Sequence, residues 1–433
     1  MKKIRVLLSA FAFSPYRGSE CAVGWNIATH LAGLFDVTVL TGDVSTAKKT
    51  LTDLNRYFAT NPPIPGLDIQ YVAPSKHIIA LEKLHTLPGA WMLYYSAYRR
   101  WQLLAYRRAV QLHAANAFDI CHNLTFIGYR EPGYLHRLRI PFVWGPISGA
   151  ENFPPAFYQS LSWAELFRPF TRDLANRFQA RFPGRIRTAA MIAKKVFAVS
   201  NAEKNLLAKW GIESELMLET GNSKQPLAKI RTKDPKEPLK IIWSGLFTPR
   251  KALPLLFRAL SRIHELGICD CRWELIILGD GPMRSLWRRE AESTSLSHRI
   301  SWLGRLERQD AINKMSESDL LVHTGLREGT PHVILEALSL GLPVICHDAG
   351  GMGTAINCEC GIKVPLRDPE TSIDGFSRAI VNVLNRPEIL EALSFGAINR
   401  ANELSWESIA RRLGDAYHSV LKLQATQEPA ISC

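Results

Sequence analysis

Residues 323–345 read HTGLREGTPHVILEALSLGLPVI, and this stretch decides the interpretation of the chain. It overlaps the apolar run LLVHT (320–324), which predicts a buried strand, and its second half predicts a helix that begins around His332–Val333. The first amides of such a helix lack partners within it and attract a phosphate or the hydroxyls of a sugar. Glu336, about one turn into the helix, could accept two hydrogen bonds from a ribose, and Glu328 in the loop could reach a sugar.

The alternative is that Glu328 caps a local turn and that Glu336 is a solvated helix residue. The setting favours a binding role. Seven residues separate the two acids, and a Gly-x-Pro loop, an apolar helix and the exit Gly341-Leu342-Pro343 accompany them.

The whole chain alternates short apolar runs with segments of helix length, and its 433 residues suit two domains. Apolar strands without strict alternation are typical of a parallel sheet that is covered on both faces. We therefore predict an α/β protein with two doubly wound, Rossmann-like domains that face a central cleft. The expected divisions are an N-terminal domain at 1–222, a linker at 223–238, a C-terminal domain at 239–404, and a helix and tail at 405–433 that can cross back to the first domain.

A second motif, SGLFTPRKALPLLFRAL (244–260), places a strand end at Gly245 and the cations Arg250 and Lys251 before a helix. Two adjacent cations in a strand-to-helix loop can neutralise a diphosphate, both when it is bound and as it departs. Taken alone, an Arg-Lys pair is usually solvated surface, so its position one strand into the second domain carries the argument.

A third motif, ILGDGP (277–282), predicts a tight turn after a strand. Gly279 and Gly281 would let a flat ring approach the backbone, and a plain turn is an equal alternative.

The N-terminal half offers two weaker candidates. In SPYRGSECAVGWNIATHLA (14–32), Gly18 and Ser19 open a loop whose amides could touch a phosphate, and Glu20 could contact an acceptor. In FDICHNLT (118–125), His122 stands near the end of a predicted strand, where ligands bind in open α/β sheets, and Asn123 is weaker. An ordinary strand–helix turn and a buried, satisfied histidine are the respective alternatives.

The composition gives a net charge of +13, which favours anionic partners. Two stretches, 91–108 and 163–187, mix arginines with tryptophan, tyrosine and phenylalanine, and such helices can lie on an anionic membrane or present a solvated basic face. No apolar run reaches about 18 residues, and the basic, apolar start reads better as a first strand than as a signal peptide. The pairs Cys269/Cys271 and Cys358/Cys360 have the wrong spacing for zinc knuckles, so free thiols in a reducing cytoplasm are expected.

In this order, the motifs resemble glycosyltransferase family 4, whose members are retaining enzymes with the GT-B fold. The resemblance covers nearly the whole chain, and it is most specific in the C-terminal half. It implies that Arg250 and Lys251 bind the donor diphosphate and that Glu336 binds the ribose. It also implies contacts to the donor from Glu328 and His122 and from a wider set: Gly18, Ser19, Gly245, Gly279, Gly281, Gly329, Thr330, Pro331, and the amides of Val333 and Ile334.

The chain departs from the family pattern at three places. Ser19 takes the second place of a frequent Gly-Gly pair, Glu219-Thr220-Gly221-Asn222 replaces an Asn-Gly before the linker, and Thr330 stands where a bulkier residue is frequent. These departures bear on the identity of the donor.

The expected activity is transfer of a hexose-type sugar from a UDP- or GDP-linked donor to a sugar or lipid-linked acceptor. The nucleotide sugar is a substrate, so no cofactor is expected, and no Asp-x-Asp metal motif occurs. A cytoplasmic enzyme at the inner face of the plasma membrane, with no nucleic-acid partner, fits these expectations. The competing classes are a non-catalytic nucleotide-binding protein and a nicotinamide-dependent oxidoreductase, for which the Gly-x-Gly-x-x-Gly motif after the first strand is missing.

Overall fold

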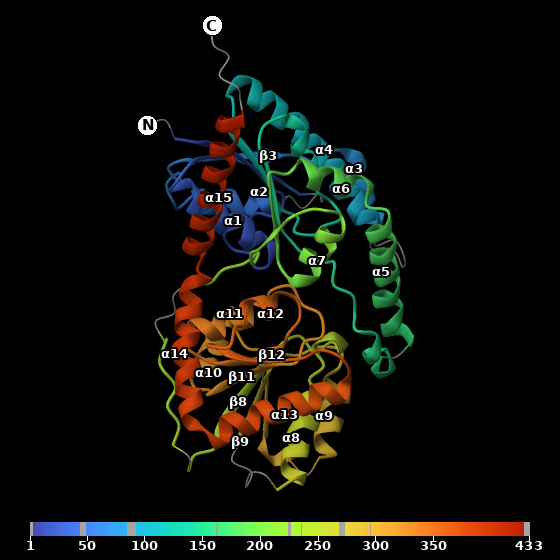
Figure 1. The fold of residues 1–433 in the computed structure, drawn as a ribbon, viewed down its shortest axis with the longest axis vertical. Coiled ribbons are helices and arrows are strands. Elements are labelled where there is room, and N and C mark those ends of the chain that lie inside the picture. The colour runs from blue at the N-terminus through green and yellow to red at the C-terminus, as the bar shows by residue number, and fades with distance from the viewer. Residues whose placement is uncertain are drawn as a thin grey trace.

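The structure is a computed structural model that describes residues 3–43, 49–84, 92–161, 163–223, 227–234, 236–267, 273–294 and 296–427. It has two parallel sheets, one above the other in Figure 1, each covered by helices on both faces. This is the GT-B arrangement of two Rossmann-like domains, so the predicted fold class is confirmed. Cys269 and Cys271 lie outside the described residues.

The first sheet has seven strands in the order β3-β2-β1-β4-β5-β6-β7, and every pairing in it is parallel. The apolar start of the chain forms β1, near the centre of this sheet. The strands are β1 (Arg5–Ala10), β2 (Asp36–Gly42), β3 (Leu67–Val72), β4 (Ile120–Thr125), β5 (Phe142–Ile147), β6 (Lys195–Ala198) and β7 (Glu215–Leu216). Its helices are α1 (Glu20–Ala32), α2 (Lys49–Phe58), α3 (Lys76–Leu84), α4 (Met92–Ala115), α5 (Trp163–Arg181), α6 (Gly184–Ile192) and α7 (Asn201–Lys209), with 3-10 turns at Leu135–Leu138 and Pro155–Ser160.

The second sheet has six parallel strands in the order β10-β9-β8-β11-β12-β13. They are β8 (Leu239–Ser244), β9 (Trp273–Leu278), β10 (Ile300–Gly304), β11 (Leu320–His323), β12 (Val344–His347) and β13 (Gly361–Val364). Its helices are α8 (Pro254–Glu265), α9 (Arg284–Glu292), α10 (Arg308–Ser316), α11 (His332–Ser339), α12 (Gly350–Ala355), α13 (Pro369–Asn385) and α14 (Pro387–Glu403), with 3-10 turns at Pro249–Lys251 and Ser297–Arg299.

The last helix, α15 (Trp406–Gln427), leaves the second domain and packs on the first (Figure 1). Trp406, Leu413 and Tyr417 are buried in the same core as Val23 of α1, and the rings of Phe35 and Tyr417 lie 5.6 Å apart. Burial of these apolar side chains ties the end of the chain to its beginning.

The polar segment before the second sheet is anchored at Arg231. Its side chain is buried and donates to the carbonyl oxygens of Ser318 at 2.9 Å, Lys229 at 2.8 Å and Leu340 at 2.9 Å. This part of the connection is therefore held on the second domain.

The two aromatic–basic stretches differ in the structure. In α4, Tyr98 and Trp101 are fully buried, and Arg99 pairs with Glu131 at 2.6 Å. The expectation that this stretch turns its aromatic side to a membrane is wrong there, because the first sheet covers that side; Trp91 lies outside the described residues. In α5 and just beyond it, by contrast, five large apolar side chains are exposed: Phe167, Phe170, Leu174, Phe178 and Phe182.

None of the described helices combines the length and apolar character needed to cross a bilayer.

Candidate active site

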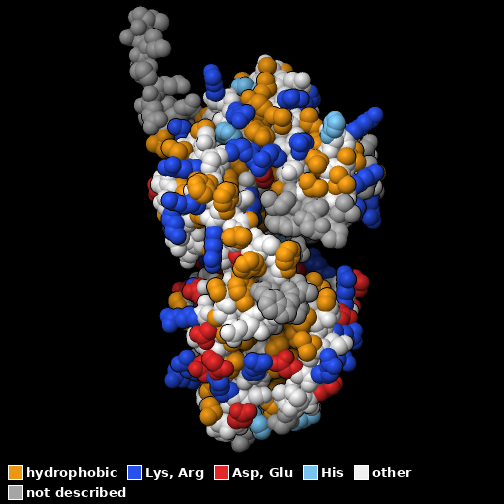
Figure 2. Space-filling model, turned by 90° about the vertical axis from the view of Figure 1, so that its right-hand side faces the viewer, with side chains coloured by type: hydrophobic (Ala, Val, Ile, Leu, Met, Phe, Trp, Pro, Cys, Tyr) orange, Lys and Arg blue, Asp and Glu red, His pale blue; other side chains and the backbone are white. Residues whose placement is uncertain are grey.

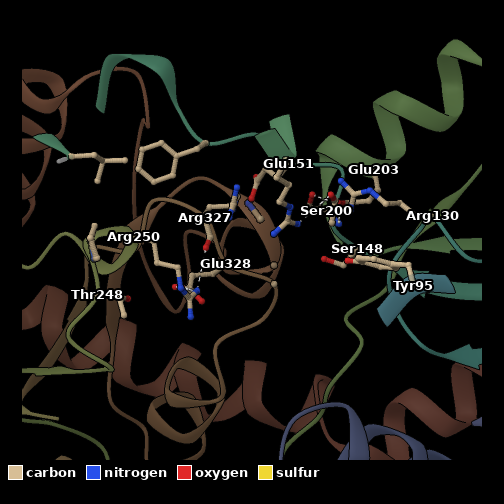
Figure 3. Close-up of a pocket in the computed structure, with 18 residues that line it drawn as sticks. Tyr95, Arg130, Ser148, Glu151, Ser200, Glu203, Thr248, Arg250, Arg327 and Glu328 are labelled. Carbon is tan, nitrogen blue, oxygen red and sulfur yellow. Dashed lines mark hydrogen bonds and ion pairs between the residues drawn. The ribbon is translucent and has the colours of Figure 1, made fainter. Parts of the chain in front are cut away.

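A cavity of about 670 Å³ lies between the two domains and contains several of the predicted residues. Arg250 and Glu328 line it from the C-terminal domain, and the loops after β5 and β6 line the opposite side (Figure 3). This position, at the carboxyl ends of parallel strands, is where ligands bind in open α/β sheets.

The centre of the C-terminal side is a cluster of two cations and one acid. Glu328 Oε1 lies 2.7 Å from Arg250 Nη1 and 3.0 Å from Lys251 Nζ. The side chains of Lys251 and Glu328 are 9% and 8% exposed, whereas that of Arg250 is 42% exposed. Burial lowers the pKa of Lys251, and the charge of Glu328 opposes that effect. One carboxylate thus holds two cations: Arg250, which lines the cavity, and Lys251, which is buried beside it and is not among the lining residues.

The strand ends fix the backbone of this cluster. The Thr324 hydroxyl donates to the Lys251 carbonyl at 2.7 Å and accepts from the indole N–H of Trp243 at 3.0 Å. The Leu326 amide donates to the Arg250 carbonyl at 2.8 Å. The 249–251 turn and the 324–328 loop therefore form one connected unit.

Helix α11 begins at His332, as the sequence predicts, and Pro331 precedes it in extended conformation. The Ile334 amide already donates to the Pro331 carbonyl at 3.0 Å, so it is not free in the way that the sequence suggested. Val333 lies beside it in the same first turn. Glu336 is partly exposed and pairs with Arg308 of α10 at 3.1 Å; it lies outside the residues that line the cavity.

Thr330 and Gly329 meet an acid from the other domain that the sequence analysis did not assign to the site. Glu219, which follows β7, accepts from the Thr330 amide at 2.8 Å and from its hydroxyl at 2.7 Å, and it is buried. A ligand that uses the Thr330 amide must therefore share it with Glu219 or displace that side chain. The only sequence signal for Glu219 was its departure from the family pattern.

Gly279 and Gly281 hold the loop after β8. Both have positive φ, and a side chain at either position would collide with backbone atoms of Gly245 or Phe247. The Phe247 amide also donates to the Asp280 carbonyl at 2.9 Å. These glycines therefore act on the turn that carries Arg250, and neither lines the cavity.

His122 does not occupy the strand end that the sequence suggested. It is the third residue of β4 and is fully buried; Nδ1 lies 2.6 Å from the Tyr417 hydroxyl and Nε2 lies 2.6 Å from the Gly145 carbonyl. Burial lowers the pKa of His122 to about 4. Both ring nitrogens bind partners inside the core and His122 is not among the residues that line the cavity, so its contact with the donor stays a prediction without support from this geometry. The neighbouring Asn123 is buried as well.

The N-terminal loop also lies away from the cavity. Ser19 precedes α1 with a φ of 56°, and neither Gly18 nor Ser19 lines the cavity. Glu20 Oε1 accepts from the Ile127 amide at 3.1 Å, and burial raises the pKa of Glu20 to about 7. Glu20 is half-buried and does not line the cavity, so its contact with an acceptor stays a prediction.

The comparisons with known proteins agree with the C-terminal geometry. Residues 225–400 match the family described as Glycosyl transferases group 1. The C-terminal domain is thus similar to this family over those residues. Its Arg250–Lys251–Glu328 cluster and helix α11 both fall inside the matched residues.

The curated relatives match mainly this domain. A GDP-mannose-dependent monoacylated alpha-(1-6)-phosphatidylinositol monomannoside mannosyltransferase of Corynebacterium glutamicum is 33% identical over 189 residues, which are 41% of this chain and 47% of the relative. A D-inositol 3-phosphate glycosyltransferase of Saccharomonospora viridis is 26% identical over 43% of this chain and 44% of its own length. The chain thus spans about half the length of the curated relatives it matches.

Solved structures match along the whole chain and show the fold. The lipopolysaccharide outer core galactosyltransferase WaaB superposes with a TM-score of 0.63 at 14% identity, over 96% of this chain and 99% of that one. Sucrose-phosphate synthase from Thermosynechococcus elongatus gives 0.61 at 18% identity, over 97% and 100%.

Opposite the C-terminal domain, the cavity is lined by polar residues that the motifs did not single out. Glu151 Oε1 accepts from the Gly350 amide at 2.6 Å across the gap, and Glu203 caps α7 through Ser200. Arg130 and Arg172 also line this side, and Arg327 joins them from the C-terminal domain. Arg172 was visible in the sequence only as one charge of a basic run, because a helix face cannot be assigned to a partner domain from periodicity alone.

The buried acid Glu151 gives a pH prediction. Burial raises its pKa to about 7 from an ordinary value of 4.5, so the folded protein keeps a proton that the unfolded chain loses in this window. Stability attributable to Glu151 is therefore lost as the pH rises from about 4.5 to 7. Glu151→Gln keeps an oxygen for the Gly350 amide without the charge. We expect its melting temperature to match wild type at pH 4.5 and to exceed it by about 2–4 °C at pH 8.

Differential scanning fluorimetry across pH 4.5–8 checks this prediction, with the exposed Glu359→Gln as control. Glu20 contributes a slope of the same sign, so the variant reduces the pH dependence without removing it. A Glu151→Gln protein with the wild-type profile throughout would show that this carboxyl ionises freely.

Proposed function

We propose that this chain is a retaining glycosyltransferase that moves a hexose-type sugar from a UDP- or GDP-linked donor onto an acceptor. The observation that carries the proposal is the cluster in which Glu328 pairs with Arg250, at the wall of the interdomain cavity, and with the buried Lys251 beside it. In our account the diphosphate binds these two cations, Glu336 binds the ribose, and the loop at Gly329 and Thr330 contacts the sugar.

In the proposed reaction, the bond from the anomeric carbon to the diphosphate oxygen breaks and a bond to the acceptor hydroxyl oxygen forms. Negative charge develops on the departing oxygen, where Arg250 and Lys251 stabilise it more than in the ground state. The departing phosphate takes the proton of the acceptor hydroxyl on the same face of the sugar. This front-side displacement retains the anomeric configuration without a carboxylate nucleophile.

A panel of nucleotide sugars tests the proposed function. We expect one nucleoside diphosphate among UDP, GDP and ADP to raise the melting temperature, and a sugar donor with that base to be consumed. GDP-mannose stands first in the panel because the name of the Corynebacterium glutamicum relative contains it. The anomeric proton coupling in the product's NMR spectrum reports retention. Stabilisation by NAD alone would instead support the oxidoreductase.

The acceptor in this proposal is lipid-linked, and the protein works at an anionic membrane surface, the inner face of the plasma membrane. Exposed Phe178 and Phe182, each 65% exposed, lie beside the exposed Arg177 and Arg181 near the end of α5. Figure 2 shows hydrophobic and basic side chains close together on the upper domain. A helix that combines exposed phenylalanines with arginines matches a bilayer with negative head groups.

Liposome co-sedimentation checks this membrane contact. We expect Phe178→Ser/Phe182→Ser to reduce binding to vesicles with 30% phosphatidylglycerol by about tenfold or more, because each buried phenylalanine contributes about 1.5–3 kcal/mol. Phe395→Ser, which removes a phenylalanine that is 58% exposed in the other domain, is the matched control. If both variants and wild type bound the vesicles equally, or if vesicle binding did not weaken as the salt concentration rises, α5 would be excluded as the membrane contact.

A further inference from the structure

The cavity has a second group of cations, on its N-terminal side. These cations have no role in the donor binding proposed above. Arg130, in the loop after β4, is only 8% exposed. Its Nε donates to Gln179 Oε1 at 2.8 Å, and a terminal nitrogen donates to Asn176 Oδ1. Both partners are neutral amides of α5, so they fix the guanidinium without neutralising its charge.

Arg172 projects from the same helix toward the same wall. One terminal nitrogen donates to the Gly149 carbonyl at 3.4 Å, and its buried Nε has no hydrogen-bond partner. Burial, and then the charge of Arg130, lower the pKa of Arg172. Within the described part of the chain, no carboxylate forms an ion pair with Arg130 or Arg172. Arg130 is buried and Arg172 is half-buried. A cation withdrawn from water without a counter-ion is costly, so a protein that keeps two of them together needs a reason.

Arg327 adds a third guanidinium from the C-terminal domain. Its contact to Asp173 Oδ1 is long, 3.6 Å, and Nη1 makes no hydrogen bond within the described residues. Asp173 meanwhile accepts from the Phe153 amide at 3.0 Å and from the Tyr158 hydroxyl at 2.6 Å. Burial first, and the charge of Arg172 second, lower the pKa of Arg327 to about 10.

The nearby acids Glu151, Glu203 and Asp173 cancel this charge only in part. Glu151 accepts from the Gly350 amide, and burial raises its pKa to about 7, so it is about half protonated near neutral pH. Glu203 is committed to the Ala150 amide at 2.9 Å and to Ser200. Three guanidinium groups from both domains therefore converge on the cavity, and burial raises the pKa of two of the three nearby acids, Glu151 and Glu203, which weakens the opposing charge.

We propose that Arg130, Arg172 and Arg327 form an anion subsite that binds a phosphate carried by the acceptor. This inference rests on the proposed function, since it names the class of acceptor for the same cavity. The planar guanidinium fork suits a phosphate, whose oxygens can take paired hydrogen bonds from two or three arginines. The Arg250–Lys251 cluster serves the donor diphosphate, so the two anions of a transfer complex are held by separate groups of cations.

Titration calorimetry on the full chain tests the subsite, with inorganic phosphate and octyl phosphate as probes. The titrations are run with and without a saturating nucleoside diphosphate, so that the donor cluster is filled in one arm. We expect wild type to bind phosphate in both arms, and Arg172→Gln and Arg130→Gln to weaken that binding at least tenfold. Arg107→Gln, which removes an exposed arginine of α4, should stay within twofold of wild type.

The two probes distinguish the source of the phosphate. Octyl phosphate that binds at least tenfold more tightly than inorganic phosphate indicates a lipid phosphate, and equal affinities indicate a soluble phosphorylated acceptor. Arg172→Gln should also keep or raise the melting temperature in phosphate-free buffer, because it removes a half-buried charge that has no ion-pair partner within the described residues. If Arg172 had a purely structural role, its replacement by Gln would lower the melting temperature.

Three results would overturn the subsite: no binding of either probe to wild type, unchanged binding by both variants, or loss of phosphate binding once nucleoside diphosphate is added. The proposed function fails differently, when no nucleoside diphosphate binds and no nucleotide sugar is consumed. In that case, the comparison of phosphate binding by wild type and by the arginine variants without nucleotide still shows whether the subsite exists.

Discussion

Lys251→Ala is expected to reduce sugar transfer by about 10²–10³-fold, the usual effect of removing one preorganised group that stabilises a developing anion. Lys251 Nζ lies 3.0 Å from Glu328 and its side chain is 9% exposed, so its charge acts in a largely water-excluded place. Because the stabilised charge develops as the bond to the diphosphate breaks, kcat should fall more than donor affinity. Release of nucleoside diphosphate under saturating donor measures this.

The matched control for this variant is Lys240→Ala, which removes an exposed lysine from β8 of the same domain. It should transfer sugar at the wild-type rate. Lys251→Met, which preserves most of the side-chain volume, separates lost charge from lost packing and should be as inactive as the alanine variant. A folded Lys251→Ala protein with more than a tenth of wild-type turnover would remove the cluster from the mechanism.

Glu336→Ala is expected to lower kcat/KM for the nucleotide sugar by about 10²–10⁴-fold. Two hydrogen bonds from ribose hydroxyls to a carboxylate are worth about 1.5–3 kcal/mol each, and each 1.4 kcal/mol is tenfold. The loss should appear mainly as a higher KM, since the ribose is held equally before and during the reaction. Steady-state kinetics over donor concentration provide the measurement.

The fold should tolerate this change. Glu336 pairs in the structure with Arg308, whose side chain is 76% exposed, and such surface pairs contribute about 0–1 kcal/mol. Glu317→Ala breaks a comparable surface pair, with Lys314 at 2.8 Å, and should leave kinetics and melting temperature unchanged. If Glu336→Ala retained a wild-type KM, the ribose would have to bind elsewhere.

The strand–loop–helix segment around 323–345 was predictable because local sequence alone determines it. The apolar run of β11, the glycine and proline of the loop, and the apolar face of α11 all agree on one structure. That Arg250 and Lys251 lie beside Glu328 follows from adjacency of β8 and β11 in the sheet, a consequence of doubly wound topology.

The rest of the site depends on contacts between the domains, which no local pattern encodes. Glu219 reaches Thr330 across 111 residues, and Glu151 reaches Gly350 across 199. The positions of His122 and Glu20 depend on similar long-range contacts: the sequence did not show that His122 would bind Tyr417 of α15, or that Glu20 would accept from the Ile127 amide. Likewise, the periodicity of apolar residues did not distinguish the two aromatic helices. The first sheet covers the aromatic face of α4, whereas the phenylalanines of α5 are exposed.

A crystal structure of the full chain soaked with the nucleoside diphosphate that stabilises it tests the central claim most directly. Our account predicts the diphosphate within hydrogen-bond distance of Arg250 and Lys251, at the start of α11, with both ribose hydroxyls on Glu336. A nucleotide bound in the N-terminal domain, or with its diphosphate away from these two cations, would contradict it.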